Sequence, residues 1–213
     1  MGQGQVMQIR QAVSSDQRAL MAIARQAFPE SLRWQLPPRS AVYWQTALAG
    51  SAHSGAETWI ATMNGEVLAG LVLVSDEIRW AHCRRSTLAM MGCYLRCSGH
   101  LPSVTRVMRR RSRLFRAGRL SAGETLDAGR VIPLESRLST DLGMVRPDSQ
   151  GHGVGRAFRR HAESRCRSLG RRYMRTMTEA DNGAMRHVLD SMQYELVQSR
   201  NNVCVYVKDL GTP

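Results

Sequence analysis

The amino-acid sequence predicts one α/β (α+β) domain, residues 1–213, built on a mixed β-sheet flanked by helices. Segments of strand character alternate with segments of helical periodicity along most of the chain. Asn64-Gly65 joins two apolar, β-rich runs, which is a strong hairpin signal because both residues tolerate positive φ. A strand, a tight glycine-rich loop and a long helix follow one another over residues 137–169. Together these observations indicate a mixed sheet.

The N-terminal half contributes two helices and three strands. Ser14, Ser15 and Asp16 offer N-cap chemistry for a helix that Pro29 ends. Apolar residues recur at helical spacing in this helix, so we expect one of its faces to pack against the core. The predicted elements are a strand at 6–13, a helix at 17–28, a short helix at 41–48 and hairpin strands at 58–62 and 66–74.

The C-terminal half completes the predicted sheet. Arg146-Pro147-Asp148-Ser149 has turn chemistry between a strand and the glycine-rich loop. The predicted elements are strands at 137–145 and 172–178, a helix that ends near 169, a helix at 184–192 and a closing hairpin at 194–198 and 202–208.

Composition points to a soluble protein with an anionic partner. Hydrophobic residues make up 43% of the 213 residues, but no apolar run reaches the roughly 18 to 20 residues of a membrane span. No secretory signal is recognisable, so we expect a cytoplasmic location. The five cysteines are expected to be free thiols. No metal ion is expected, because Cys93, Cys97 and His100 do not have a strong ligand spacing.

The positive charge is concentrated in two segments. The net charge is +13, and 29 of the 30 basic residues are arginines. Residues 78–123 contain eleven arginines and no acid, while residues 156–175 contain eight arginines and one acid. Such clustering indicates an anionic partner more than a generally basic protein. Residues 101–114 have helical character, and the stretch is either a solvated helical excursion or a docking surface.

The glycine-rich loop has the properties of an anion site. Gln150, Gly151, His152, Gly153, Val154 and Gly155 lie where a strand leads into a helix, so backbone amides and the helix dipole converge there. A Walker loop is excluded because Arg156-Ala157 follows the last glycine, and the glycine spacing does not fit a dinucleotide fingerprint.

Gln150, Gly153 and Gly155 fit the pattern Gln/Arg-x-x-Gly-x-Gly/Ala, so the segment resembles the acetyl-CoA signature of the GNAT superfamily of N-acetyltransferases. The resemblance covers most of the chain, since the Asn-Gly hairpin precedes the motif and residues 182–194 fall where the family has its second motif. It implies a splayed sheet whose strands near 138–145 and 172–178 enclose the CoA arm. Residues 78–130 would be a basic insertion between the third and fourth strands.

The resemblance also implies acetyl-CoA or another acyl-CoA as cofactor, with a direct acyl transfer to a primary amine. Backbone groups of Met144 and Val145 would bind pantetheine, a bulge near Val145 would polarise the thioester carbonyl, and Asn182 would contact the cofactor arm. The amides of residues 151–156, including Arg156, would bind pyrophosphate. The arginines at 156, 159 and 160 are candidate partners for CoA phosphates.

The catalytic residues depart from the family pattern. Leu189 stands where the usual general-acid tyrosine would fall, and Ser139 stands where a strand carboxylate is common. Asp141 lies two residues further on, and strict alternation would place it on the same face as Ser139. Asp141 is therefore the first candidate base, Glu135 the second, and His187 a candidate acid. The alternative is that both carboxylates are surface partners of arginines.

On the acceptor side, Trp34, Tyr43 and Trp44 could form an aromatic wall or pack in the core. The acceptor amine could be carried on an acidic partner such as charged tRNA, a nucleotide-linked metabolite or an acyl carrier protein, bound by the arginine-rich insertion. Alternatively the enzyme acylates a small free amine, and the insertion is a lid or a homodimer contact. A different class of function is a catalytically degenerate module that binds CoA or RNA.

Overall fold

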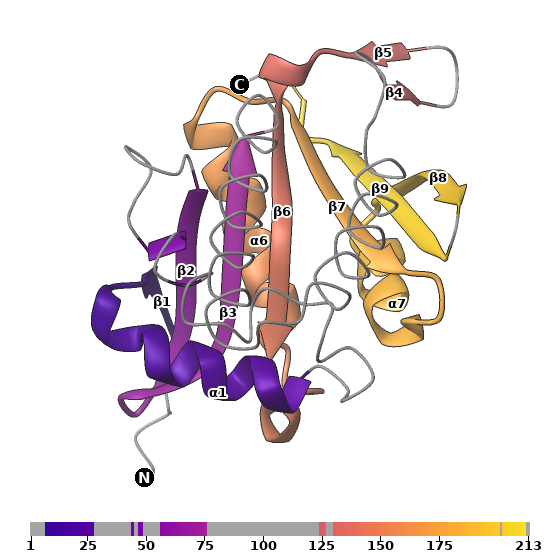
Figure 1. Cartoon of the computed structure of the whole chain (residues 1–213). Coiled ribbons are helices and arrows are strands. Elements are labelled where there is room, and N and C mark those ends of the chain that lie inside the picture. The colour runs from indigo at the N-terminus through magenta and orange to yellow at the C-terminus, as the bar shows by residue number, and fades with distance from the viewer. Residues whose placement is uncertain are drawn as a thin grey trace, which may run out of the picture.

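The computed structural model describes residues 7–27, 44, 47–48, 56–75, 124–126, 130–200 and 202–211. Within these ranges the main sheet has the strand order β1-β2-β3-β6-β7-β9-β8 (Figure 1). Its strands are β1 (Gln8–Gln11), β2 (Ala56–Met63), β3 (Glu66–Ser75), β6 (Arg137–Val145), β7 (Tyr173–Glu179), β8 (Glu195–Arg200) and β9 (Val203–Asp209). The helices are α1 (Gln17–Ala27), α6 (Val154–Ser168) and α7 (Gly183–Ser191). The predicted mixed α/β architecture is confirmed.

The main sheet contains one parallel pair among its described strands, β6 with β7, and the other neighbours are antiparallel. The hairpin between β2 and β3 turns at Asn64 and Gly65, whose φ angles are 53° and 80°. This is the double positive φ that an Asn-Gly turn provides. The strands and helices of the C-terminal half start and end within about two residues of their predicted positions.

Helices cover both faces of the main sheet. α1 packs on one face, where Leu20, Ile23 and Ala24 contact a cluster that includes Val72 and Met144. α6 and α7 cover the other face, and in Figure 1 α6 passes behind β2, β3 and β6. The side chains of this second cluster include Leu71, Leu138, Phe158, Ala162, Met174 and Leu189. Leu71 and Val72 are neighbours in β3 and point to opposite clusters, so both faces of the central strand are buried.

The start of α1 differs from the expected N-cap. Ser14, Ser15 and Asp16 form a short 3-10 turn, η1 (Ser14–Asp16), ahead of the helix. The Asp16 carboxylate accepts a hydrogen bond from the Val13 amide at 2.8 Å and pairs with Arg10. The Arg10 guanidinium holds the pKa of the Asp16 carboxyl below its usual value. Asp16 thus ties β1 to the beginning of α1.

Most of the basic insertion, with its predicted helix at 101–114, lies outside the described residues. At its C-terminal end β4 (Glu124–Leu126) and β5 (Arg130–Ile132) pair antiparallel, where the sequence predicted no strands. No helix in the described part of the chain is long and apolar enough to cross a membrane. Likewise, the described residues contain no cluster of three metal-ligating side chains.

Candidate functional site

β6 and β7 pair over a short distance and then separate. Their parallel register joins Arg137 to Tyr173, Leu138 to Met174 and Ser139 to Arg175. Beyond these pairs β6 continues along β3 to Val145, while β7 continues along β9 to Glu179. The facing edges of residues 140–145 and 176–179 therefore lack a strand-to-strand ladder, and Figure 1 shows the two ribbons diverging toward α7. The expectation of a splayed pair of strands is confirmed.

β6 carries a bulge at the start of this divergence. Val72 pairs with Leu142 and Leu73 with Thr140, so Asp141 is an extra residue in β6. The bulge was expected near Val145, and this expectation was wrong. It also interrupts the alternation of side chains, so the argument that placed Asp141 on the same face as Ser139 does not hold. Asp141 itself is partly exposed.

The glycine-rich loop joins β6 to α6 after a 3-10 turn, η5 (Pro147–Ser149). Gly151 and Gly153 have φ angles of 78° and 81°, which favour glycine. A Cβ atom placed on Gly151, Gly153 or Gly155 would contact no atom of the described residues within 4 Å. Within this part of the chain these glycines therefore do not serve internal packing, and the space beside them is open.

The open space borders unsatisfied backbone donors. The first helical bond of α6 joins the Ala157 amide to the Gly153 carbonyl at 2.9 Å, and Gly153 supplies no side-chain cap. None of the described hydrogen bonds uses the amides of residues 151–156 as donors. Several N–H groups and the positive end of the helix dipole thus face open space, an arrangement that fits a diphosphate group.

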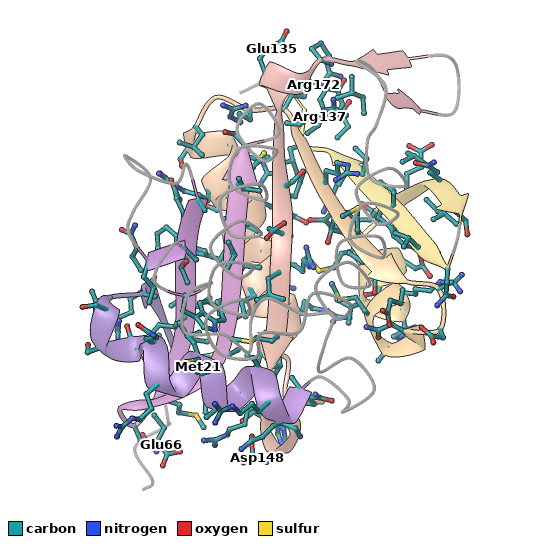
Figure 2. All side chains as sticks on the ribbon, in the orientation of Figure 1. Met21, Glu66, Glu135, Arg137, Asp148 and Arg172 are labelled. Atoms are coloured by element: carbon teal, nitrogen blue, oxygen red, sulfur yellow. The ribbon has the colours of Figure 1, made fainter. Side chains whose placement is uncertain are left out.

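Side chains hold the loop in place. Arg146 donates to Asp148 at 2.6 Å and to Glu66 of β3 at 3.1 Å. The side-chain amide of Gln150 donates through Nε2 to the Val145 carbonyl at 3.2 Å. The Arg146 guanidinium also lowers the pKa of the Asp148 carboxyl. Figure 2 shows Glu66 and Asp148 at the same end of the sheet. Arg146 therefore links the loop to β3 and offsets part of the negative charge of these two carboxylates.

The other expected cofactor residues lie on β6, in the glycine-rich loop, on α6 and at the start of α7. Met144 is buried against the α1 cluster, and Val145 packs against the α6 cluster. Asn182 caps α7, its Oδ1 atom accepting from the Met185 amide at 3.1 Å, which leaves its NH₂ group for other contacts. Arg156 donates to Ser191 of α7 at 3.0 Å. His152 is exposed, and its Nδ1 atom lies 2.8 Å from the Gln150 carbonyl oxygen.

The candidate catalytic residues lie on three different elements. Asp141 lies at the divergence, and His187 is exposed on α7. Glu135 is exposed in the short turn η4 (Leu134–Ser136), and Figure 2 places it near Arg137 and Arg172, at the opposite end of the sheet from Asp148. Leu189 is fully buried in the α6 cluster, so α7 presents no hydroxyl at that position.

Of the three aromatic acceptor candidates, Trp34 and Tyr43 lie outside the described residues. Trp44 is fully buried beside Leu20 and Ile23 in the α1 cluster. Trp44 is therefore found in the core, as the second of its two expected roles requires.

Sequence reasoning missed the position of Arg159. It was expected beside CoA phosphates, together with Arg156 and Arg160. Arg156 and Arg160 are exposed, but Arg159 is 4% exposed and donates to the Thr140 hydroxyl at 2.8 Å. The available signal was spacing, since position 159 precedes Ala162 by three residues and Cys166 by seven, on the buried face of α6.

The comparison with solved structures supports the fold. No family model matches the sequence, and no curated protein matches it. Solved structures that are similar include the ribosomal-protein-S18-alanine N-acetyltransferase of Escherichia coli, at 13% identity and a TM-score of 0.56, covering 98% of this chain and 96% of that one. PaiA N-acetyltransferase of Thermoplasma acidophilum in complex with coenzyme A is similar at 10% identity and a TM-score of 0.62, covering 96% and 99%.

A third similar structure is YncA of Salmonella typhimurium with acetyl-CoA, at 14% identity and a TM-score of 0.58, covering 96% of this chain and 94% of that one. The GNAT domain of S. lividans PAT is also similar, at 16% identity and a TM-score of 0.59, covering 95% of this chain and 90% of that one. These similarities extend over nearly the whole chain. The chain therefore has the GNAT fold.

Proposed function

We propose that this chain is an acyl-CoA-dependent N-acyltransferase that transfers an acyl group, acetyl in the first instance, from the thioester to a primary amine. The observation that carries the proposal is the divergence of β6 and β7 beside a glycine loop with free amides. The fold adds support, because similar structures contain coenzyme A or acetyl-CoA.

In this proposal the backbone amides of residues 151–156 bind the diphosphate, and the side chains of Arg156 and Asn182 contact the cofactor arm. The unpaired edge of β6, including the backbone groups of Met144 and Val145, offers strand-like hydrogen bonds to pantetheine amides. When bound, acyl-CoA supplies an acyl group activated as a thioester. The protein has to align the amine, polarise the carbonyl and accept a proton.

Asp141 is the proposed base for the amine proton, directly or through water. It is the bulged residue of β6, where the regular ladder with β3 is interrupted, and a backbone N–H of this segment is the proposed donor to the thioester carbonyl. Glu135 lies at the far end of β6 and is a weaker candidate. His187 remains a proposed acid from α7.

The acceptor is proposed to be an amine on an anionic carrier. Residues 78–123 supply eleven arginines without one acid, and such a concentration of positive charge attracts tRNA, nucleotide-linked metabolites and acyl carrier proteins alike. Trp34 and Tyr43 are proposed to border the amine, with Trp44 supporting them from the core.

The direct test is a thermal shift with acetyl-CoA, followed by release of free thiol when amines, tRNA or acyl carrier protein are added. We expect stabilisation by acetyl-CoA and thiol release with at least one acceptor class. Absence of any shift would overturn the proposal. Binding without thiol release would favour the degenerate CoA-binding module instead.

A further inference from the structure

A buried cation lies beneath the bulge of β6. Arg159 of α6 is 4% exposed, and its Nη1 atom donates to the Thr140 hydroxyl at 2.8 Å. Its Nη2 atom lies 3.8 Å from the position that a Cβ atom would take on Gly143. The guanidinium group therefore spans the bulged segment of β6, from the residue before Asp141 to a residue after it.

The charge of Arg159 is not balanced by a carboxylate of its own. Glu163, one turn further along α6, is buried and pairs with Lys208 of β9 at 3.0 Å. Among the described residues, Arg159, Glu163 and Lys208 thus form a group with one net positive charge. Burial lowers the pKa of the Arg159 guanidinium, which reflects the free-energy cost of holding a cation there. Such a cost is offset when an anion binds nearby.

Two buried hydroxyl groups on the same side of the sheet add to the polarity of this region. The Tyr194 hydroxyl is near Glu163 but outside hydrogen-bonding geometry, and burial raises its pKa. Thr176 is the first residue of β7 beyond the last pair with β6, and its Oγ1 atom has no hydrogen-bond partner among the described residues. Thr176 shares a face with Met174 of the α6 cluster, because β7 pairs with β9 without a bulge.

We propose that Arg159 stabilises the thiolate that leaves in the acyl transfer, an inference that rests on the proposed function. An arm held at residues 151–156 and extended along the free edge of β6 would bring its thiol end toward the start of the divergence, where Thr140 follows the last pair with β7. In the reaction the amine nitrogen forms a bond to the acyl carbon. The carbon–sulfur bond breaks, and sulfur keeps its electron pair.

Two proton transfers accompany the acyl transfer. The amine loses its proton to Asp141 or water, and the thiolate takes a proton from solvent as the product leaves. A cation beside sulfur favours the thiolate over the thiol. This role suits a chain that has Leu189, which is buried and cannot donate a proton, at the position where the family resemblance implies an acid.

Ionisable groups on β6, β7 and the elements packed against them have to be considered in any pH measurement. They are Asp141 of β6, Arg175 of β7, Glu163 of α6, Arg186 of α7, Tyr194 after α7, and Lys208 of β9. Of these, Tyr194 and Glu163 are close enough to act on the Arg159 charge.

The test is the pKa of the thiol of bound coenzyme A, followed by ultraviolet absorbance of the thiolate while pH is varied. We expect the wild-type complex to hold this pKa at least about one unit below the ordinary thiol value of about 8.5. Arg159→Met should return it toward that value, and Arg159→Lys should keep part of the shift. Arg167→Met removes the same charge from an exposed position on α6 and should change nothing.

The variants also separate this role from a structural one. Arg159→Met should bind coenzyme A within about threefold of wild type, lose about tenfold in kcat with acetyl-CoA, and be no less stable without ligand. A wild-type protein that binds no coenzyme A would overturn the proposed function. Coenzyme A bound with an unshifted thiol pKa, or a shift that survives in Arg159→Met, would overturn the role of Arg159 alone. If Arg159→Met does not fold, the wild-type shift and Arg159→Lys still decide the question.

Discussion

Ser139 of β6 and Arg175 of β7 are the last residues at which these two parallel strands pair. From Thr140 and Thr176 onward each strand keeps only its outer neighbour, β3 for β6 and β9 for β7. Strand edges without a ladder expose N–H and C=O groups that an extended ligand can satisfy. The position of this last pair therefore sets the depth to which a ligand can enter the sheet.

A first prediction concerns amide hydrogen exchange at this edge. Acetyl-CoA at about 100 times its Kd should slow exchange of the gap-facing amides in residues 140–145, and of the amides in residues 151–156, by up to about 100-fold. Peptides from β1 and β2, on the far side of the sheet, should exchange as before. Exchange measured by mass spectrometry with and without acetyl-CoA checks this, and unchanged exchange in both segments would contradict ligand entry between β6 and β7.

A second prediction concerns Gly153. Gly153→Glu places a negative charge and a side chain in the open space beside the free amides, so acetyl-CoA binding should weaken at least about 100-fold. The strain of a side chain at φ 81° should also cost about 1–2 kcal/mol of unfolding free energy. Calorimetric titration with acetyl-CoA measures the binding loss.

Gly170→Glu is the matched control for this variant. Gly170 has φ 67° at the opposite end of α6, with nothing within 4 Å of an added Cβ atom. It should lose similar stability and keep wild-type affinity for acetyl-CoA. Equal loss of affinity for acetyl-CoA in both variants would mean that backbone strain, and not the negative charge beside the amides of the glycine-rich loop, causes the effect.

A third prediction distinguishes the two candidate bases. Asp141→Asn should lower kcat by about 10²–10⁴-fold with little change in the KM of acetyl-CoA, as expected when a group that takes a proton is removed. Glu135→Gln should keep wild-type turnover, because Glu135 lies beyond the paired end of β6 and β7. Steady-state thiol release from acetyl-CoA measures both, and full activity in Asp141→Asn would remove this carboxylate from the mechanism.

Much of the fold could be predicted because it depends on local patterns. The Asn64-Gly65 turn and the β6–loop–α6 unit both rest on backbone conformations that glycine and asparagine favour. The bulge at Asp141 could not be predicted, because it depends on the register between β6 and β3, which are far apart in sequence. β4 and β5 were missed for a different reason, since strands of three residues carry too little periodicity.

The candidate site was predictable to a similar extent. The positive φ of Gly151 and Gly153 and the start of α6 follow from the motif itself. The location of Arg159 does not, because an arginine in a basic helix is expected in solvent. Its burial results from the packing of α6 across β6, where the Thr140 hydroxyl becomes its hydrogen-bond partner.

A fourth prediction concerns stability and pH through the contact between Glu57 of β2 and Arg165 of α6. Arg165 donates to both carboxylate oxygens, at 2.6 and 2.8 Å, and the Glu57 side chain is 15% exposed. The hydrogen bonds from Arg165 lower the pKa of the Glu57 carboxyl, so the ionised form stabilises the fold. This stabilisation is complete above the unfolded pKa of about 4.3, and it is lost as pH falls through the lower folded pKa.

Glu57→Gln should therefore lower the free energy of unfolding by about 1–3 kcal/mol near neutral pH, with the difference from wild type shrinking below about pH 4. Urea unfolding across this pH range measures the difference, with Glu195→Gln, an exposed carboxylate on β8, expected to stay within about 0.5 kcal/mol of wild type. A difference that is constant with pH would show that packing at this contact, and not its charge, carries the stabilisation.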